Sequence, residues 1–161
     1  MIVVNAPAKI NITLEVLRKR LDGYHEIRSI MQAISLSDTL VFTEADRLKI
    51  TSDDVKWDGT ISLVAKAASL LRERTGIHRG ASILVQKRIP LLAGLGGDSS
   101  DAAAALTGLN EIWSLGLNRD DLLSVGRELG SDIAFFFYGG TALATGRGEI
   151  ITPLPSFPHC W

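Results

Sequence analysis

Cysteine is almost missing from this sequence of 161 residues, which has one, Cys160. No disulfide can therefore form within these residues, and this suits a reducing compartment. No apolar run approaches the ~20 residues that a membrane-spanning helix needs. The first residues place Lys9 and Asn11 soon after a short apolar stretch, which is unlike a signal peptide. We therefore expect a cytoplasmic protein without a membrane partner.

Net charge is low as well, with a formal value of −1 at pH 7. Proteins that bind nucleic acid usually carry a basic surface, so this balance argues against a nucleic-acid partner. Hydrophobic residues make up 46% and charged residues 22%, which is typical of a globular chain rather than a disordered one. The length suits one domain, residues 1–161.

Apolar periodicity predicts strands grouped apart from helices. Strands are expected at residues 2–4, 10–17, 27–34, 39–43, 48–51, 81–86, 141–144 and 149–151, and helices at 61–75, 100–113 and 119–129. Along residues 10–17 the alternation of Ile10, Ile12, Leu14 and Val16 with polar residues predicts one apolar face. This grouping favours an α+β fold over a regularly alternating parallel sheet.

The most informative stretch is a glycine-rich loop at residues 90–103, which reads Pro-Leu-Leu-Ala-Gly-Leu-Gly-Gly-Asp-Ser-Ser-Asp-Ala-Ala. Its three glycines permit positive φ angles and let an anion approach the backbone amides without a Cβ in the way. The Ser-Ser-Asp at 99–101 favours a helix start, and a helix N-terminus offers unpaired N–H groups to a phosphate. The stretch predicts a phosphate site, although an ordinary capped helix would use the same residues.

Two common phosphate loops are excluded by the residues around Asp98. A Walker A loop ends in Gly-Lys-Ser or Gly-Lys-Thr, whereas Gly97 is followed here by Asp98. A dinucleotide fingerprint needs a third glycine to close the helix against the strand, and this chain has Asp98 and Ser99 instead. The loop therefore predicts a third kind of nucleotide site.

Two charged residues stand beside apolar segments, and each leaves two interpretations open. Lys9 begins an apolar strand, so it either points inward toward an anionic partner or is a solvated lysine at a strand end. Asp132 precedes the apolar run 133–137, where a carboxylate can accept a proton from a hydroxyl or pair with an ammonium. Alternatively it caps a helix, a role for which Ser131 competes.

A turn-forming Asp-Gly at residues 22–23 is followed directly by Tyr24 and His25. Flat side chains beside a turn suit stacking and hydrogen bonding with a planar base. Such pairs also occur as plain surface packing. The sequence ends on Pro-Ser-Phe-Pro-His-Cys-Trp, which is typical of the beginning of another strand, so we expect that a C-terminal half is missing.

Four stretches in this order resemble the N-terminal domain of GHMP kinases: residues 6–11 (Ala-Pro-Ala-Lys-Ile-Asn), 22–27 (Asp-Gly-Tyr-His-Glu-Ile), 87–103 (Lys-Arg-Ile-Pro followed by the glycine-rich loop) and 130–142 (Gly-Ser-Asp, then Gly-Gly-Thr-Ala). Gly-Leu-Gly-Gly-x-Ser-Ser marks the superfamily, and Asp-Gly-Tyr-His narrows the resemblance to kinases of a cytidine-diphosphate-linked methylerythritol. The resemblance implies an α+β domain with a left-handed β-α-β unit.

The resemblance also implies an activity. ATP would phosphorylate the 2-hydroxyl of that small-molecule substrate, in the methylerythritol phosphate route to isoprenoid precursors. Lys9 and Asp132 would be the catalytic pair, in which Asp132 orients or deprotonates the hydroxyl and Lys9 offsets charge on the phosphoryl oxygens.

Further positions follow from the same resemblance. Tyr24 and His25 would bind the cytosine, with Asn11 and Lys87 as further polar contacts to the substrate. The ATP phosphates would lie on Pro90, Leu91, Leu92, Ala93, Gly94, Leu95, Gly96, Gly97, Asp98, Ser99 and Ser100. Mg²⁺ is expected to accompany ATP, although no metal-ligand cluster in the sequence shows where it binds.

Members of this family carry a second domain that closes the site, so these 161 residues by themselves are expected to turn over weakly. A nucleotide-binding fragment without catalysis is one alternative. Another is a GHMP kinase acting on mevalonate, homoserine or galactose, from which the Asp-Gly-Tyr-His element distinguishes this sequence. A structural or nucleic-acid-binding domain of similar topology is disfavoured by the neutral charge balance and the four motifs.

Overall fold

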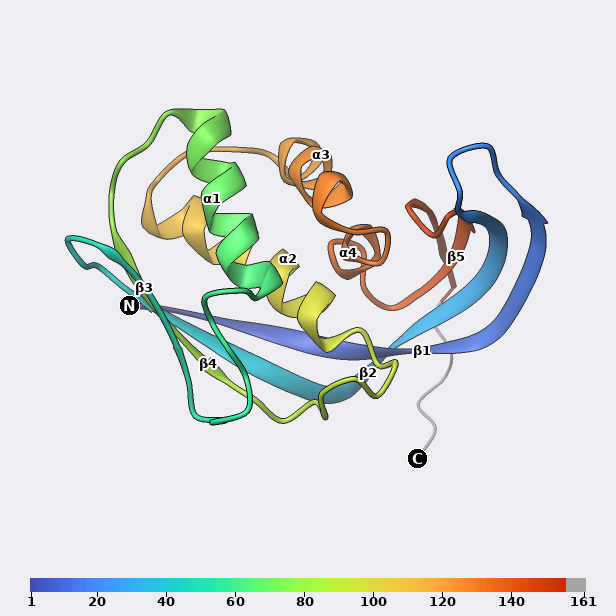
Figure 1. Cartoon of the computed structure of the whole chain (residues 1–161), viewed down its shortest axis with the longest axis horizontal. Helices are drawn as coiled ribbons and strands as arrows, with labels where there is room; N and C mark the ends of the chain where they lie inside the picture. The colour runs from blue at the N-terminus through green and yellow to red at the C-terminus, as the bar shows by residue number, and fades with distance from the viewer. Residues whose placement is uncertain (156–161) are drawn as a thin grey trace.

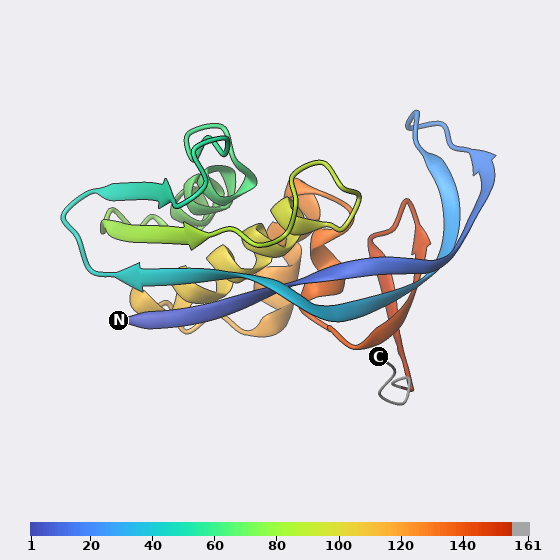
Figure 2. The same cartoon turned by 90° about the horizontal axis from the view of Figure 1, so that it is seen from below.

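One sheet of six strands runs through the molecule, and the helices gather on one face of it (Figures 1 and 2). The computed structural model describes residues 1–155. In chain order the elements are β1 (Ile2–Lys19), β2 (His25–Thr43), β3 (Leu48–Ser52), α1 (Leu63–Thr75), β4 (Ala81–Gln86), α2 (Gly97–Ile112), α3 (Arg119–Leu129), α4 (Ile133–Phe136), β5 (Thr141–Gly146) and β6 (Ile150–Leu154).

Strand β2 organises the sheet. It pairs antiparallel with β1 along nearly its whole length, and its other edge is shared by β5 and β4. The first half of β2 pairs with β5, as at Gln32 and Thr141, and the second half pairs with β4, as at Thr39 and Gln86. The strand order is therefore β3-β4-β2-β5-β6, with β1 on the far edge of β2.

Two of the predicted breaks between strands are wrong, because β1 and β2 are each continuous where the sequence predicts two strands. The register of β1 against β2 shifts between Pro7 and Lys9, between Asn11 and Thr13, and again near Val16. Bulges of this kind insert an extra residue without ending a strand. They interrupt the alternating pattern in the sequence while the backbone pairing continues.

The only parallel pairing among the described strands joins β3 to β4 through α1 and forms a β-α-β unit. Local signals fix α1: the Ser62 side chain caps its N-terminus by accepting a bond from the Ala65 amide, so the helix begins two residues later than predicted, and Gly76 ends it as predicted, in the left-handed region. The α+β prediction is confirmed. The left-handedness of the unit stays a prediction.

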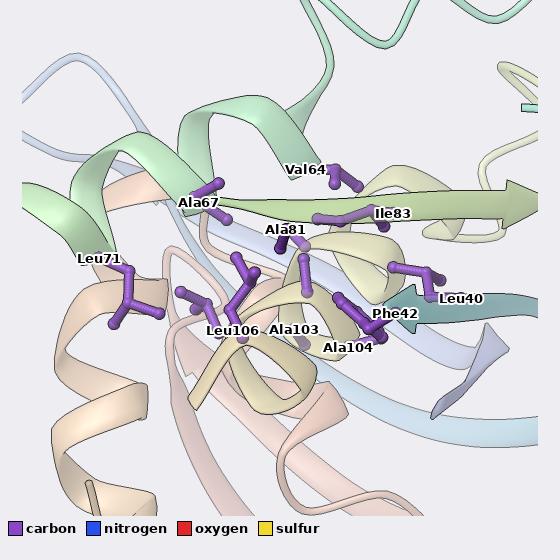
Figure 3. Packing of buried hydrophobic residues seen from close by; sticks show 14 of the residues in the cluster. Leu40, Phe42, Val64, Ala67, Leu71, Ala81, Ile83, Ala103, Ala104 and Leu106 are labelled. Atoms are coloured by element: carbon purple, nitrogen blue, oxygen red, sulfur yellow. The ribbon is translucent and has the colours of Figure 1, made fainter. Parts of the chain in front are cut away.

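Helix α2 lies close against the sheet, and this places its N-terminus at the candidate site. Its alanines at 102–105 are buried, and Figure 3 shows Ala103 and Ala104 beside Phe42 of β2. A Cβ on Gly108 would come within 2.3 Å of the Phe42 ring. Small residues on this face therefore set the distance between helix and sheet.

The predicted apolar face of residues 10–17 is not covered by the described part of the chain. Ile12, Leu14 and Val16 are 45%, 58% and 61% exposed. The reason is the length of the β1–β2 hairpin, which extends beyond the helices and curls away from them (Figure 2).

The remaining strands and α3 follow the predictions closely, whereas no helix is predicted at the position of α4. Strand β4 and helix α3 have the predicted bounds, and β5 and β6 differ from them by one to three residues at their ends. The further strand predicted from the last residues lies outside the described residues. Within residues 1–155, no helix combines the length and apolarity that crossing a membrane requires.

Candidate active site

The glycine-rich loop leads into α2 earlier than predicted. Gly96 is the N-cap residue in the left-handed region (φ 72°), and the helix begins at Gly97. No side chain caps this end, so the prediction that residues 99–101 start the helix is wrong, and they lie inside its first turns. The orphan amides of the first turn remain free of side-chain caps, which is the arrangement that suits a phosphate.

Gly96 could not be replaced without disturbing the site. A Cβ there would lie 2.9 Å from Phe136 Cζ and 3.0 Å from Lys9 Cγ, and its φ of 72° is unfavourable for other residues. The loop therefore has no side chain at the position where its backbone lies next to the Lys9 side chain.

A hollow of about 140 Å³ is lined by Lys87 and by residues 90–99. These are the predicted ATP-phosphate positions except Ser100, which is 1% exposed and lies deeper. The Ser100 hydroxyl has no hydrogen-bond partner among residues 1–155. Asp98, in the first turn of α2, is exposed, and its charge complements the positive end of the helix.

Lys9 and Asp132 meet beside this loop, although they are far apart in the sequence. Lys9 Nζ lies 3.5 Å from Asp132 Oδ2, and Lys9 is only 7% exposed. The inward interpretation of Lys9 is confirmed, and the solvated alternative is wrong. Asp132 stands at the N-cap position of α4 but makes no side-chain capping bond, and its side chain is 36% exposed. One carboxylate oxygen is therefore held near an ammonium while the group stays open to a ligand.

A chain of hydrogen bonds fixes the lysine. Lys9 Nζ donates to Asn11 Oδ1 at 2.6 Å, Asn11 Nδ2 donates to Ser29 Oγ at 2.6 Å, and Ser29 Oγ donates to the Thr13 carbonyl at 2.6 Å. Ser29 is fully buried, and sequence reasoning missed it because nothing local distinguishes it in its strand. The chain also orients Asn11 toward the ammonium.

The backbone joins Lys9 to the loop. The Lys9 amide donates to the Leu95 carbonyl at 2.9 Å, so β1 and the glycine-rich loop are hydrogen-bonded next to the Lys9 side chain. The ammonium and the bare amides of the loop therefore have a fixed relative position, as phosphoryl transfer requires.

Tyr24 and His25 lie at the end of the β1–β2 hairpin and are exposed. Asp22 Oδ1 accepts a bond from the Tyr24 amide at 3.1 Å, and Gly23 adopts φ 86°, so the turn is well defined. The guanidinium carbon of Arg147 lies 5.0 Å from the Tyr24 ring centroid. The tyrosine is thus held in place while 53% of it remains exposed.

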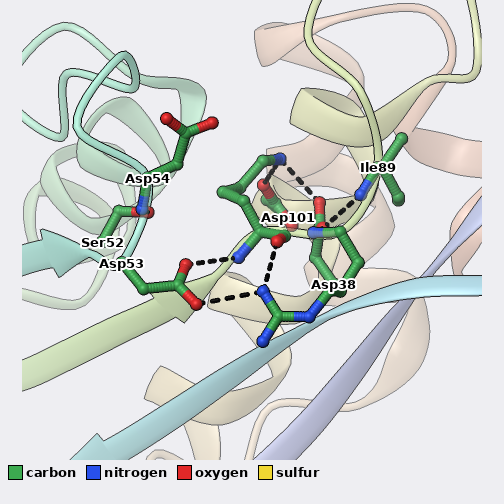
Figure 4. Close-up of polar contacts among 8 residues, drawn as sticks. Asp38, Ser52, Asp53, Asp54, Ile89 and Asp101 are labelled. Atoms are coloured by element: carbon green, nitrogen blue, oxygen red, sulfur yellow. Dashed lines mark hydrogen bonds and ion pairs between the residues drawn. The ribbon is translucent and has the colours of Figure 1, made fainter.

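Lys87 lies in a buried ion-pair network at the base of the loop, and Figure 4 shows its partners Asp38 and Asp101. Its ammonium donates to Asp38 Oδ2 at 2.6 Å and to Asp101 Oδ2 at 2.8 Å. The other Asp38 oxygen accepts bonds from the Arg88 and Ile89 amides, at 2.8 Å from Ile89. The network joins β2, the beginning of the loop and the first turn of α2, which gives Lys87 a structural role. Its predicted contact with substrate stays a prediction.

Sequence reasoning missed Asp38, which belongs to no recognisable pattern, and it gave Asp101 only a role at the start of the helix. Burial raises the pKa of Asp101 to about 7, and attraction to Lys87 limits the rise. Burial also works to lower the pKa of Lys87, but Asp101 and Asp38 outweigh it and raise that pKa. Each group favours the charged form of its partner.

This network predicts a pH-dependent stability. Between about pH 4 and pH 7 Asp101 is ionised in the unfolded chain but keeps its proton in the folded one, so the free energy of unfolding falls as the pH rises through this window. Above about pH 7 both states are ionised and the effect stops. We expect Asp101→Asn to remove this pH dependence of the free energy of unfolding. The change across the window has an upper bound of about 4 kcal/mol, since each pH unit contributes about 1.4 kcal/mol.

Urea unfolding at pH 5 and pH 8 measures this effect. The stability of Asp101→Asn relative to wild type should be higher at pH 8 than at pH 5. Parallel pH profiles for the two proteins would show that Asp101 carries no proton in the folded state at pH 5.

Comparison with known proteins agrees with this geometry. Residues 62–140 match the family model for the GHMP kinases N terminal domain. The 4-diphosphocytidyl-2-C-methyl-D-erythritol kinase of Dehalococcoides mccartyi is 52% identical over the whole chain, which covers 57% of that relative. The enzyme of the same name from Geobacillus kaustophilus is 51% identical over 98% of the chain, and 56% of that relative is covered.

Solved structures give the same result. A crystal structure of 4-(cytidine 5'-diphospho)-2C-methyl-D-erythritol kinase matches with a TM-score of 0.81 and 39% identity, over 95% of this chain and 55% of that one. Mevalonate kinase of Methanococcus jannaschii shares the fold, with a TM-score of 0.73 and 16% identity over 96% of this chain and 56% of its own. The chain thus spans somewhat more than half the length of the curated relatives it matches. By motifs, fold and sequence identity, the chain matches the N-terminal domain of GHMP kinases.

Proposed function

We propose that the protein is a 4-diphosphocytidyl-2-C-methyl-D-erythritol kinase, which transfers the γ-phosphoryl group of ATP to the 2-hydroxyl of its substrate. The observation that carries the proposal is the 3.5 Å approach of Lys9 Nζ to Asp132 Oδ2 beside a bare glycine loop. The 52% identity to a kinase of that name supports this choice of substrate.

The loop and the start of α2 provide the nucleotide site. Backbone amides around Gly96 and Gly97 donate hydrogen bonds to the phosphate oxygens. Mg²⁺ would neutralise part of the phosphate charge. No group of three metal-ligating side chains occurs in residues 1–155, so the ion would be held largely by the phosphates themselves.

Asp132 and Lys9 act on the acceptor hydroxyl. The carboxylate of Asp132 is open enough to accept a hydrogen bond from that hydroxyl, and it takes the proton as the new O–P bond forms. Lys9, held by Asn11, forms an ion pair with Asp132 and offsets charge on the phosphoryl oxygens. Positioning and charge stabilisation therefore account for most of the rate.

Tyr24 and His25 form the base site in this proposal. Cytosine stacks on the exposed ring of Tyr24, and His25 supplies a hydrogen bond to its polar edge. Asn11 adds an amide close to the hydroxyl end of the substrate.

Loss of the Tyr24 ring tests the substrate assignment. We expect Tyr24→Ala to weaken cytidine binding by about 10–100-fold, since stacking on an aromatic ring contributes about 1–3 kcal/mol per base. Calorimetry with cytidine and with ATP measures this, and ATP affinity should stay unchanged. Tyr138→Ala is the matched control, because Tyr138 also has an arginine over its ring but contacts Arg119 instead. Unaltered cytidine affinity in Tyr24→Ala would point to another substrate.

We further propose that a C-terminal half completes the molecule and closes the site. The share of the relatives that this chain covers supports this, as does the exposed apolar face of the hairpin. Residues 1–161 by themselves would then bind nucleotide but turn over slowly. A cytoplasmic location suits an enzyme that consumes ATP.

A further inference from the structure

Arg147 lies in the turn between β5 and β6 and is not accounted for by the pair of catalytic groups. Its guanidinium stacks over Tyr24 and forms no ion pair within residues 1–155. Asp22, the acidic residue of the neighbouring turn, forms its ion pair with Arg20 at 3.0 Å and attracts Arg147 only at longer range. A half-buried guanidinium therefore has donors left for a ligand.

The turn holds its own shape without this side chain. The Glu149 carboxylate accepts a bond from the Arg147 amide at 2.7 Å, and the Gly148 amide donates to the Thr145 carbonyl at 3.1 Å. Gly146 has a φ of 72°. Because these bonds are donated by the backbone amides of residues 147 and 148 and not by the Arg147 side chain, the guanidinium is free to act on something else.

The position of the turn indicates what that is. A Cβ on Gly148 would lie 3.6 Å from Asp132 Oδ1, so one side of the turn borders the carboxylate where the hydroxyl is expected. The preceding residue, Arg147, reaches to Tyr24, where the base is expected. A substrate that extends from Asp132 to Tyr24 must pass Arg147, and in a cytidine-diphosphate-linked substrate the diphosphate is the part that connects these two ends.

We propose that Arg147 binds the diphosphate of the substrate, an inference that rests on the proposed function. Guanidinium donors match phosphate oxygens in pairs, and hydrogen bonds between charged groups are the stronger ones. The guanidinium contacts the Tyr24 ring while 53% of that residue stays exposed, so part of the ring is left for the base. Arg147 is thus a specificity residue that favours nucleoside diphosphates over nucleosides.

A series of ligands isolates this contact. Calorimetry with cytidine, CMP and CDP is carried out on the complete polypeptide, as wild type, Arg147→Gln, Arg147→Lys and Arg119→Ala. We expect Arg147→Gln to lower the affinity for CDP by about 10–100-fold and the affinity for cytidine by less than about threefold. The loss of affinity for CMP should lie between these two. Arg147→Lys should recover part of the CDP affinity, since it keeps the charge. Arg119→Ala loses the same kind of ring contact, with Tyr138, and should bind all three as wild type does.

The outcomes separate this inference from the proposed function. Equal weakening of all three ligands in Arg147→Gln would mean that Arg147 only supports the Tyr24 ring, and the inference would be overturned while the substrate assignment stands. Unchanged affinity for CDP would overturn it in the same way. If wild type bound none of the three, both the assigned substrate and the role of Arg147 would fall.

Discussion

Asp132→Asn is expected to lower kcat by about 10²–10⁴-fold while the affinities for ATP and for the cytidine substrate change little. Asparagine keeps the shape of the side chain but cannot take the proton of the acceptor hydroxyl. It also removes the negative partner of Lys9, which lies 3.5 Å away. ADP release by the complete polypeptide measures kcat, and calorimetry measures the two affinities.

Asp120→Asn is the matched control, because Asp120 lies exposed in the first turn of α3. Its kcat should equal that of wild type. Lys9→Met should also reduce kcat strongly, and the double variant should be little worse than Asp132→Asn, since residues that act as a unit are not additive. A kcat near wild type in Asp132→Asn would remove this residue from the mechanism.

Lys87→Met is expected to reduce the free energy of unfolding by about 3–5 kcal/mol, the typical result of removing one partner of a buried ion pair. Its ammonium neutralises Asp38 and Asp101, whose side chains are completely buried. At pH 8, where Asp101 is ionised in the folded chain, methionine fills a similar volume but leaves both carboxylates without a cation. Urea unfolding measures the change, and Lys66→Met, on the exposed face of α1, is the control that should alter stability by less than about 0.5 kcal/mol.

The loop should respond to the same substitution. Asp38 holds the backbone amides of Arg88 and Ile89, so an unpaired Asp38 no longer fixes the beginning of the glycine-rich loop. The double variant Lys87→Met/Asp101→Asn lacks one of the two unpaired carboxylates. It should recover part of the free energy of unfolding that Lys87→Met loses. An unfolding free energy for Lys87→Met equal to that of Lys66→Met would show that the network contributes nothing to the folded state.

Local signals explain which parts of the fold could be predicted from the sequence. Ser62 and Gly76 delimit α1, and Asn118 caps α3 by accepting bonds from the Asp120 and Asp121 amides. The start of α2 has no such signal, because its N-cap is a glycine without a side-chain bond and its position depends on packing against β1. The continuity of β1 across Pro7 was likewise hidden, since register shifts depend on the partner strand.

The residues of the candidate site were likewise only partly predictable from the sequence. Motifs of the family marked Lys9 and Asp132, but only the folded chain shows that an ammonium at the start of β1 and a carboxylate before α4 lie 3.5 Å apart. Ser29, Asp38 and Arg147 follow no pattern in the sequence. Each becomes functional through a contact with a residue from another element, and such contacts depend on the tertiary fold.

The hydrogen bond between the Lys9 amide and the Leu95 carbonyl has a consequence for how the two substrates affect each other. Strand β1 runs from this bond to the hairpin that ends at Tyr24. A single strand therefore connects the proposed nucleotide site at the glycine-rich loop with the proposed base site at Tyr24. We expect a shift of the loop on ATP binding to be passed along this strand. Thermodynamic linkage then requires reciprocity: whatever factor ATP imposes on the affinity for the cytidine substrate, that substrate imposes on the affinity for ATP.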